Sequence, residues 1–447
     1  MIWSLLISCS GAPEDRPSVL LVVLDTVRSD HTSLGGAPPA RTPQLTAIAT
    51  AGTTWTQVTA PGAWTWPSHA SLFTGEAPWV HGAHGASREE GMTLKDTLRV
   101  TPLREDLPTL AERFAEAGYR TEALVANRLL SRPLGLTRGF DRVEHAGADE
   151  EVVRQAIERM PGEQPLLMFV NLMGAHSPYC PSDLGPVRAE HVGAQAWTEP
   201  YRSGPCLSFF TTQPSGVEEY MAGRLEIPAQ GLQLLDGLYS GEILEVDRQL
   251  NRLLTAWQLE QPGGVLVVTS DHGEYLGEHG LLEHSGSVYS QLTHVPLVLA
   301  GPGVPAGVRD DTPVQLQDLF GTMLELAGIE RTPHSLARPG SMPADRAITS
   351  AAWVRPHLAD SVGGRFAQPW RSLRRGDEAV ILVGDAVELY DLAGDPGMLV
   401  DRAAESPERA QELGAEAREL IPTKAADGGL KVDAELIQQL EALGYIQ

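Results

Sequence analysis

Lysine is scarce in this sequence of 447 residues, which contains only Lys95, Lys424 and Lys431. None of the three lies within the motifs described below, so chemistry that needs a reactive amine, such as a Schiff base, has little support. Positive charge as a whole is outweighed, because 34 Lys and Arg stand against 58 Asp and Glu, a formal net charge of −24. Such an acidic surface repels phosphate backbones, which argues against nucleic acid as a partner.

Long apolar runs are also missing, since no stretch reaches the roughly 18 to 20 unbroken apolar residues of a membrane-spanning helix. The first residues, MIWSLLISCSGAPEDRP, hold a short apolar run followed by Cys9, an order that resembles the cleavage box of a bacterial lipoprotein signal. We therefore expect residues 1–16 to be a leader and linker, and the protein to be exported to the periplasm or outer surface. A lipidated Cys9 would attach it to a membrane. No Arg or Lys precedes the run, so a mis-assigned or truncated start stays open.

Cysteine is equally rare, and the other two, Cys180 and Cys206, lie in an irregular segment rich in Pro, Gly and Ser. In an exported protein they could close a disulfide across that segment. Two unrelated thiols are the alternative. We expect the segment at 180–230 to shape the substrate pocket, because binding residues concentrate on loops carried by a rigid scaffold.

The composition is that of a soluble globular protein, with 42% apolar and 21% charged residues. Strand-like apolar runs alternate with helical patterns, with strands at 17–24, 119–127, 166–171 and 264–270 and helices at 107–117 and 239–257. This alternation predicts a doubly wound α/β sheet with helices on both faces over residues 17–340. Short strand-like pieces at 379–384 and 386–392 and an Ala-, Glu- and Arg-rich tail predict a small C-terminal α+β subdomain over 341–447.

Polar side chains follow two of the predicted strands at the point where each strand ends. Asp25 comes directly after PSVLLVVL, and Asp271 and His272 come directly after GVLVVTS. Because ligands bind beyond the carboxyl ends of strands in open α/β sheets, we expect these side chains to meet at one site. Taken alone, Asp25 could instead cap a helix.

The segment from Thr65 to Gly75, TWPSHASLFTG, resembles the nucleophile segment of sulfatases. In that family a Cys or Ser, followed by x-Pro-Ser-Arg, presents the reactive group at the start of a helix. A helix start offers unpaired N–H groups and a positive dipole end, and both stabilise an anionic ester. An ordinary helix N-cap is the plainer interpretation of Thr65.

The resemblance continues in the same order along nearly the whole chain. It includes VLDTVRSDH at 23–31, RTPQLTAIATAGTTW at 41–55, LPTLAERFAEAGYRT at 107–121, AHSP at 175–178, TSDHGEYLGEHG at 269–280, HVPLVLAGPG at 294–303, ELYDL at 388–392 and the terminal LEALGY. The chain thus resembles the sulfatase family of the alkaline phosphatase superfamily. This resemblance implies the alkaline-phosphatase-like fold and a catalytic domain over 17–340.

Departures from the sulfatase pattern bear on the reaction. Sulfatases oxidise their Cys or Ser to formylglycine, whereas Thr65 cannot become that aldehyde, and His69 stands where they carry the Arg that marks the modification site. Thr26 replaces the second carboxylate of the first metal motif. Asn127 or a neighbour, and His284, replace two lysines that hold the sulfate. We therefore expect no formylglycine.

At these positions the chain resembles the Thr-nucleophile members of the superfamily, which are lipoteichoic acid synthase and the phosphoethanolamine transferases. Those proteins use one acidic residue, a Thr and an Asp–His pair around a divalent metal. The resemblance implies that Asp25, Thr65, Asp271 and His272 bind one divalent metal ion, with Thr65 as nucleophile. A shell that mixes imidazole with carboxylates favours zinc or manganese over calcium.

The same resemblance implies roles for four further residues. His176 and His284 would hold the non-bridging oxygens or protonate the leaving group, and His69 and Asn127 would contact the substrate. The plainer alternatives are a helix or core contact for His69 and a turn residue for His176.

We therefore predict a metal-dependent hydrolase that cleaves a sulfate or phosphate ester of a small molecule, glycan or lipid through a Thr nucleophile. One metal and no nearby Lys suit a monoanionic ester better than a dianion. A phosphotransferase that moves a phospho-alcohol group to an acceptor is an alternative. So is a non-catalytic binding protein that retains the fold.

Overall fold

The computed structural model describes residues 16–85, 101–130, 135–181, 202–203, 206–207, 215–284, 286–354 and 356–424. The predicted leader with Cys9 and the terminal LEALGY motif lie outside these residues. In the described part of the chain, no helix combines the length and apolar character needed to cross a membrane.

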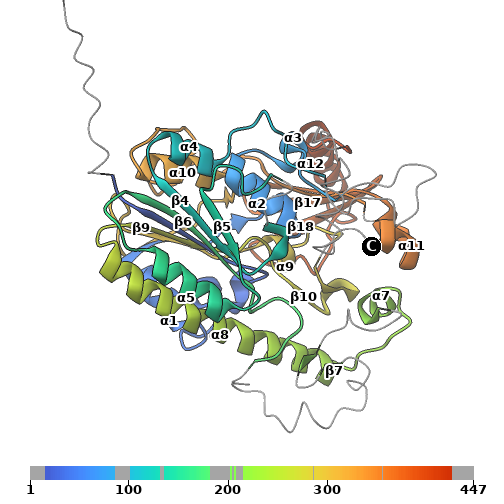
Figure 1. Cartoon of the computed structure of the whole chain (residues 1–447). Helices are drawn as coiled ribbons and strands as arrows, with labels where there is room; N and C mark the ends of the chain where they lie inside the picture. Colours follow the sequence, from blue (N-terminus) through green and yellow to red (C-terminus); the bar gives the residue numbers. More distant parts are fainter. Residues whose placement is uncertain are drawn as a thin grey trace, which may run out of the picture.

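A large mixed sheet lies at the centre of the described structure (Figure 1). Its eight strands are β1 (Val19–Leu24), β2 (Gly52–Trp55), β4 (Arg120–Val125), β5 (Arg142–His145), β6 (Leu166–Leu172), β9 (Val265–Thr269), β12 (Leu297–Ala300) and β13 (Val308–Asp310). They stand in the order β13-β2-β12-β9-β1-β6-β4-β5. All neighbouring pairs are parallel except those of β12, which runs antiparallel to β9 and β2. Strands β1, β6 and β9 are buried along their whole length, as their apolar runs predicted.

Helices cover both faces of this sheet (Figure 1). One face carries α2 (Thr65–Thr74), α4 (Leu110–Glu116) and α10 (Asp318–Leu326), and the other carries α1 (Pro43–Ala51), α5 (Asp149–Arg159) and α8 (Ala229–Glu260). Successive side chains of β1 point to opposite faces, so Leu21 joins the first core and Leu20 and Val22 join the second. The predicted doubly wound α/β fold is confirmed.

Two helix boundaries differ from those predicted. Helix α8 begins ten residues before the predicted Tyr239, at Ala229, because Leu234, Leu235 and Leu238 extend its buried stripe upstream. Helix α4 begins at Leu110, after an N-cap at Thr109. Thr109 and Glu112 form a reciprocal capping box, which sets this start more firmly than the preceding proline does.

A second, smaller sheet follows the main one, in agreement with the predicted C-terminal subdomain. It is antiparallel and consists of β15 (Ile348–Ala352), β16 (Trp370–Arg375), β17 (Glu378–Val383) and β18 (Ala386–Asp391). Helix α12 (Pro407–Leu420) packs on one face of it. The other face packs against the main domain through Trp370 and Ile381. The division at residue 340 stays a prediction.

The irregular segment at 180–230 is described only in part. Cys180 is disulfide-bonded. Cys206 begins the short strand β8 (Cys206–Leu207), whose side chains lie outside the description, so the pairing of the two cysteines stays a prediction.

A fully buried histidine, His81, braces the helix α2 from the neighbouring short helix α3 (Pro78–His81). The backbone N–H of Ala83 donates to its Nδ1 at 3.0 Å, so its proton sits on Nε2, which lies 3.0 Å from Ser71 Oγ. Burial lowers the pKa of His81 to about 3, from an ordinary value of 6.5. His81 is therefore held in its neutral form.

We expect the free energy of unfolding of His81→Gln to fall less steeply than that of wild type as the pH is lowered from neutral to about 4.5. Below pH 6.5 the unfolded chain takes up a proton on His81, whereas the folded protein does not until about pH 3. Wild-type stability is therefore lost as the pH falls through this window, by up to about 1.4 kcal/mol per pH unit. Urea unfolding from neutral pH to about pH 4.5 measures the slope, with His334→Gln at an exposed position as control. Equal slopes for wild type and His81→Gln would contradict this assignment.

Candidate active site

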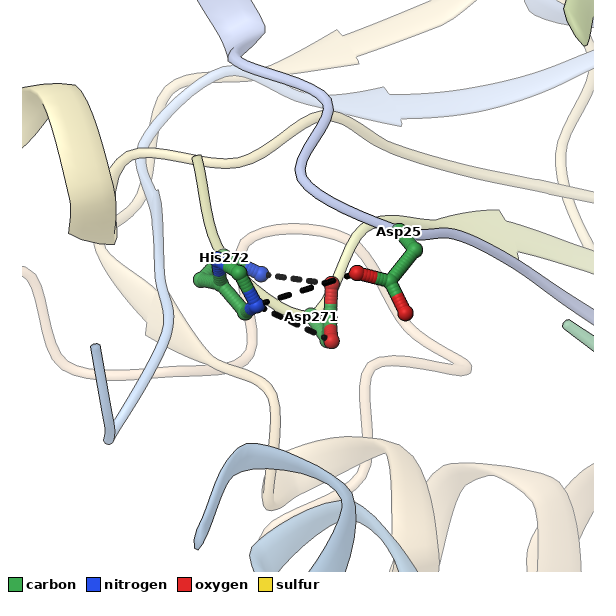
Figure 2. A group of neighbouring side chains, drawn as sticks. All are labelled: Asp25, Asp271 and His272. Carbon is green, nitrogen blue, oxygen red and sulfur yellow. Dashed lines mark hydrogen bonds and ion pairs between the residues drawn. The ribbon is translucent and has the colours of Figure 1, made fainter. Parts of the chain in front are cut away.

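Two carboxylates and one imidazole converge beyond the ends of adjacent strands (Figure 2). Asp25 follows β1, and Asp271 and His272 follow its neighbour β9. One potential ligand atom of each residue lies within 4.8 Å of the others. His272 Nε2 is 3.4 Å from Asp271 Oδ2 and 3.8 Å from Asp25 Oδ1. The structure thus brings together three of the four residues that the sequence suggested as metal ligands.

Asp25 is held by amide side chains from the two next strands of the sheet. Its Oδ2 accepts hydrogen bonds from Asn127 Nδ2 at 2.9 Å and from Asn171 Nδ2 at 3.2 Å. Asn127 follows β4 and Asn171 lies near the end of β6. The residue after Asp25 is Thr26, in a left-handed conformation with φ of 63°, and no α-helix begins there among the described residues. Asp25 is therefore not a helix cap.

Asp271 and His272 are fixed by backbone groups. Asp271 Oδ1 accepts the N–H of Thr26 at 3.2 Å and the N–H of His272 at 2.9 Å. The carbonyl oxygen of Gly273 lies 2.9 Å from His272 Nδ1, which must donate to it. The proton of His272 therefore sits on Nδ1, and the lone pair of Nε2 points toward the two carboxylates.

The facing atoms of these three residues fit a divalent cation. Asp25 Oδ1, Asp271 Oδ2 and His272 Nε2 are all buried, and none has a hydrogen-bond partner among the described residues. A buried polar atom without a hydrogen-bond partner destabilises the folded state. In each of these three side chains, the other polar atom already makes the hydrogen bonds that orient the group. Two carboxylate oxygens and an imidazole nitrogen, all turned to one point, are the donor set of a metal site.

The electrostatics of this cluster are those of charges that lack a counter-ion. Burial, together with the neighbouring Asp25 carboxylate, raises the pKa of Asp271 well above its usual range. Burial opposes ionisation of Asp25 as well, but attraction to His272 and His176 and the Asn127 hydrogen bond outweigh it and lower the Asp25 pKa. Burial and the nearby His284 lower the pKa of His272. A cation at this point would keep both carboxylates ionised and the imidazole neutral.

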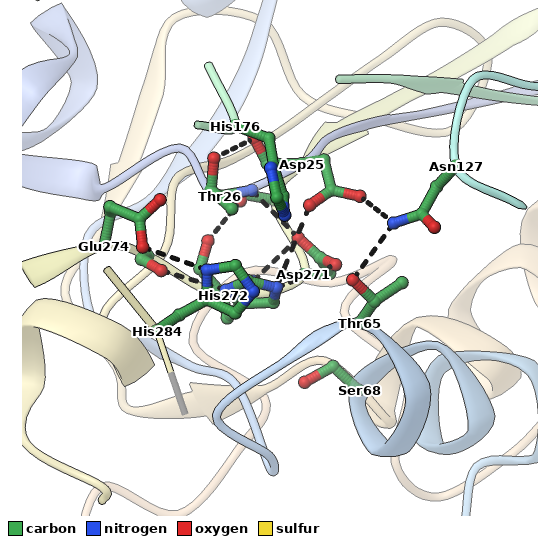
Figure 3. A network of polar contacts seen from close by, with 12 residues as sticks. Asp25, Thr26, Thr65, Ser68, Asn127, His176, Asp271, His272, Glu274 and His284 are labelled. Carbon is green, nitrogen blue, oxygen red and sulfur yellow. Dashed lines mark hydrogen bonds and ion pairs between the residues drawn. The ribbon is translucent and has the colours of Figure 1, made fainter. Parts of the chain in front are cut away.

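Thr65 is the first residue of α2, and Trp64 occupies the N-cap position. Its side chain is buried, and its Oγ1 accepts a hydrogen bond from Asn127 Nδ2 at 3.2 Å. Because the same Nδ2 atom donates to Asp25 Oδ2, Asn127 links the hydroxyl to the acidic cluster (Figure 3). The N-cap interpretation of Thr65 is wrong, and its hydroxyl faces the Asp25 side of the site.

His69 lies one helical turn after Thr65 and is fully buried. Its Nδ1 donates to the carbonyl oxygen of Thr65 at 2.9 Å and lies 3.5 Å from Asp271 Oδ2. Its ring packs against Phe73 and Phe169, and burial lowers its pKa. These are the helix and core contacts of the plainer interpretation, and contact with a substrate stays a prediction.

His176 and His284 stand beside His272, on the side of Asp271 away from Thr65 (Figure 3). The ring centroids of His272 and His284 are 4.6 Å apart, and those of His176 and His284 are 4.9 Å apart. His284 Nδ1 lies 3.0 Å from Oε1 of Glu274, a fully buried carboxyl whose pKa burial raises to about 8. The structure thus places both predicted histidines at the site.

Sequence reasoning missed two residues of this site, Asn171 and Glu274. Each carried a signal that could have found it. Asn171 interrupts the otherwise apolar run of β6, where a buried amide needs a partner. Glu274 follows His272 by two positions in the motif TSDHGE and is one of several acidic residues there.

The fold and the site together define a class of protein. Metal-type ligands follow two adjacent strands of a doubly wound sheet, and a hydroxyl stands at the start of a helix on the same side. The profile of the sulfatase family matches residues 17–329. The chain belongs to the sulfatase family.

The sequence identity to individual relatives is low, between 21% and 30% for the three proteins described next. The chain is 30% identical over 173 residues to arylsulfatase K of Xenopus laevis, a match that covers 35% of this chain and 31% of the relative. It is 23% identical over 381 residues to a sulfatase of Formosa agariphila, covering 71% and 70% of the two chains. The crystal structure of the phosphonate monoester hydrolase of Agrobacterium radiobacter matches with a TM-score of 0.67 at 21% identity, covering 91% and 95%. The chain thus spans about a third to a half of the length of the arylsulfatase K relatives that it matches.

Proposed function

We propose that this protein is a metal-dependent hydrolase that cleaves a sulfate or phosphate ester, with Thr65 as its nucleophile. One observation carries the proposal: three buried, partnerless ligand atoms converge beside a hydroxyl that starts a helix. The family profile supports ester hydrolysis, and the threonine supports direct attack by a side-chain oxygen.

A divalent metal held by Asp25, Asp271, His272 and the Thr65 oxygen would lower the pKa of the hydroxyl and neutralise charge on the ester. The mixed imidazole and carboxylate shell favours zinc or manganese over calcium. Asn127 holds the Thr65 oxygen by donating to it, which turns the hydroxyl proton away from the amide. The start of the ten-residue helix α2 adds a positive dipole end beside the oxygens of the ester.

The chemistry is an in-line displacement in two steps. The Thr65 hydroxyl gives up its proton to solvent, its oxygen forms a bond to sulfur or phosphorus while the bond to the alcohol breaks, and a covalent sulfo- or phospho-threonine results. His176 and His284, whose rings lie near His272, would protonate the departing alcohol or hold the non-bridging oxygens. Water then attacks the covalent intermediate and releases the free acid and the threonine hydroxyl.

Formylglycine has no place in this proposal. The Cβ of threonine bears a methyl group, so oxidation of the Thr65 hydroxyl would give a ketone and not an aldehyde. His69 also replaces the Arg of the sulfatase modification motif. These two features support the similarity to Thr-nucleophile enzymes such as lipoteichoic acid synthase and the phosphoethanolamine transferases.

The charge of the site favours a monoanionic ester. Its described cationic candidates are histidines, while Arg28, the nearest arginine in sequence to Asp25, already pairs with Asp30 and Glu278. A dianionic phosphate monoester asks for more positive charge than this. One relative is named as an arylsulfatase and one structural neighbour as a phosphonate monoester hydrolase. For this chain we propose a sulfate ester or a phosphodiester of a small molecule, glycan or lipid.

A substrate panel tests this proposal. Protein stripped with EDTA and reloaded with Zn²⁺, Mn²⁺ or Ca²⁺ is assayed on p-nitrophenyl sulfate, p-nitrophenyl phosphate and bis-p-nitrophenyl phosphate. We expect Zn²⁺ or Mn²⁺ to support turnover, with a monoanionic ester at least about tenfold better than the dianion. Release of one nitrophenol per protein, followed by turnover only when an alcohol is added, would favour the phosphotransferase. Metal binding without any turnover would favour the binding protein.

A further inference from the structure

The metal-type ligands come from two loops, and one arginine outside the ligand set makes hydrogen bonds to both loops. The first ligand loop, residues 25–30, carries Asp25, and the second ligand loop, residues 270–278, carries Asp271 and His272. Arg28 belongs to the first loop, and only 5% of it is exposed. Its side chain makes hydrogen bonds to groups of both loops.

The guanidinium of Arg28 divides its donors between the two loops. Nη1 donates to the carbonyl oxygen of Glu274 at 3.1 Å and to Glu278 Oε1 at 2.7 Å, both in the second ligand loop. Nε and Nη2 donate to the two carboxylate oxygens of Asp30 at 3.0 and 2.7 Å, in the first ligand loop. The planar, forked guanidinium can make all of these bonds at once, which a lysine ammonium cannot.

The stem of Arg28 also packs directly on the second ligand loop. A Cβ atom at Gly273 would lie 2.9 Å from Arg28 Cγ and 2.0 Å from the carbonyl oxygen of Gln291. Gly273 is the residue after the metal-type ligand His272, so the arginine stem lies against the loop one residue beyond that ligand. Only glycine fits between these groups.

The backbone around Arg28 is fixed as well. The hydroxyl of Tyr239 donates to the carbonyl oxygen of Thr26 at 2.6 Å and accepts the N–H of Arg28 at 2.9 Å. Thr26 adopts a left-handed conformation that is uncommon for a β-branched residue. That conformation allows its N–H to reach Asp271 Oδ1 in the second ligand loop.

We propose that Arg28 is a positioning residue that clasps the two ligand loops together and so sets the spacing of Asp25 from the Asp271–His272 pair. The inference rests on the metal site proposed above. Without a cation the two carboxylates repel each other, and a clasp outside the ligand set resists their separation. The charge of Arg28 is already balanced by Asp30 and Glu278, so its contribution is to the geometry of the site.

Metal affinity tests this inference directly. Full-length protein is stripped with EDTA, and the dissociation constant for Zn²⁺ is measured by competition with a chromophoric chelator. We expect Arg28→Met to bind Zn²⁺ about 10- to 100-fold more weakly than wild type, and Arg28→Lys to be intermediate. Arg138→Met, which removes an arginine–glutamate pair at the N-terminus of α4, outside both ligand loops, should leave the affinity unchanged. An Arg28→Met protein that folds and binds Zn²⁺ within threefold of wild type would overturn the clasp.

A second pair of variants covers the case in which Arg28→Met does not fold. Glu278→Gln and Asp30→Asn each remove one negative partner of Arg28, but only Glu278 lies across the loop boundary. We expect the larger loss of Zn²⁺ affinity in Glu278→Gln. Equal losses in both variants would contradict the clasp, because they would show that charge balance alone matters. Failure of wild type to bind Zn²⁺ or Mn²⁺ would instead reject the metal site on which the inference rests.

Discussion

Thr65→Ala should lower turnover by at least about 1000-fold, because it removes the atom that attacks the ester. The variant should fold, since the Thr65 side chain accepts one hydrogen bond, from Asn127, and does not occupy the N-cap position of α2. Initial rates on the best ester of the substrate panel measure the loss. Quenched digests of the wild type should show a sulfo or phospho group on the peptide that contains Thr65, and an unmodified threonine when no substrate is added.

Two further variants of α2 separate the loss of the nucleophile from damage to the helix. Thr74→Ala removes a buried hydroxyl at the other end of the same helix, where it donates to the Ala70 carbonyl, and should retain wild-type turnover per folded molecule. Thr65→Ser keeps the oxygen and should stay within about tenfold of wild type. If Thr65→Ala kept a tenth or more of the wild-type rate, the nucleophile would have to be another group, such as a bound water.

The positions of the metal-type ligands were accessible from the sequence because local patterns determine them. A short continuous apolar run that is rich in β-branched residues favours a strand buried on both faces, and such strands neighbour each other in the centre of a parallel sheet. β1 and β9 are adjacent, so the residues that follow them had to meet. Thr65 was accessible through the resemblance of its segment to the nucleophile segment of sulfatases, whereas its local pattern alone suggested a helix N-cap, a position that Trp64 occupies.

The supporting contacts could not be predicted in this way, because they join residues far apart in the chain. Asn171 binds Asp25 across 146 positions, and Arg28 binds Glu278 across 250. A periodic pattern in the sequence cannot reveal such a pair, because the two residues meet only when the chain folds. β15 and β16 were missed for a related reason: their polar residues are buried against the main domain and α12, which breaks the apolar pattern of a buried strand.

Asp271→Asn should abolish metal binding and turnover together while the fold persists. The amide oxygen of an asparagine can take the place of Oδ1 and still accept the two backbone N–H groups of Thr26 and His272. Its NH₂ group then falls where Oδ2 faces Asp25 and His272, and an amide nitrogen cannot coordinate a cation. Metal content after dialysis against Zn²⁺ and initial rates on the panel substrates measure the two losses. Each should reach at least about 1000-fold.

Thermal unfolding with and without EDTA shows whether a cation offsets the repulsion at this cluster. A ligand at about 1000 times its dissociation constant stabilises the folded state by roughly 4 kcal/mol, so EDTA should lower the melting temperature of wild type by several degrees. EDTA should leave Asp271→Asn unchanged, and this variant should melt no lower than metal-free wild type, because one of two repelling buried carboxylates is gone. Asp247→Asn is the matched control, since Asp247 is a buried carboxylate that accepts two backbone N–H groups at the start of α1. It should be less stable than wild type by the same amount with and without EDTA. A wild-type response to EDTA in Asp271→Asn would place the cation elsewhere.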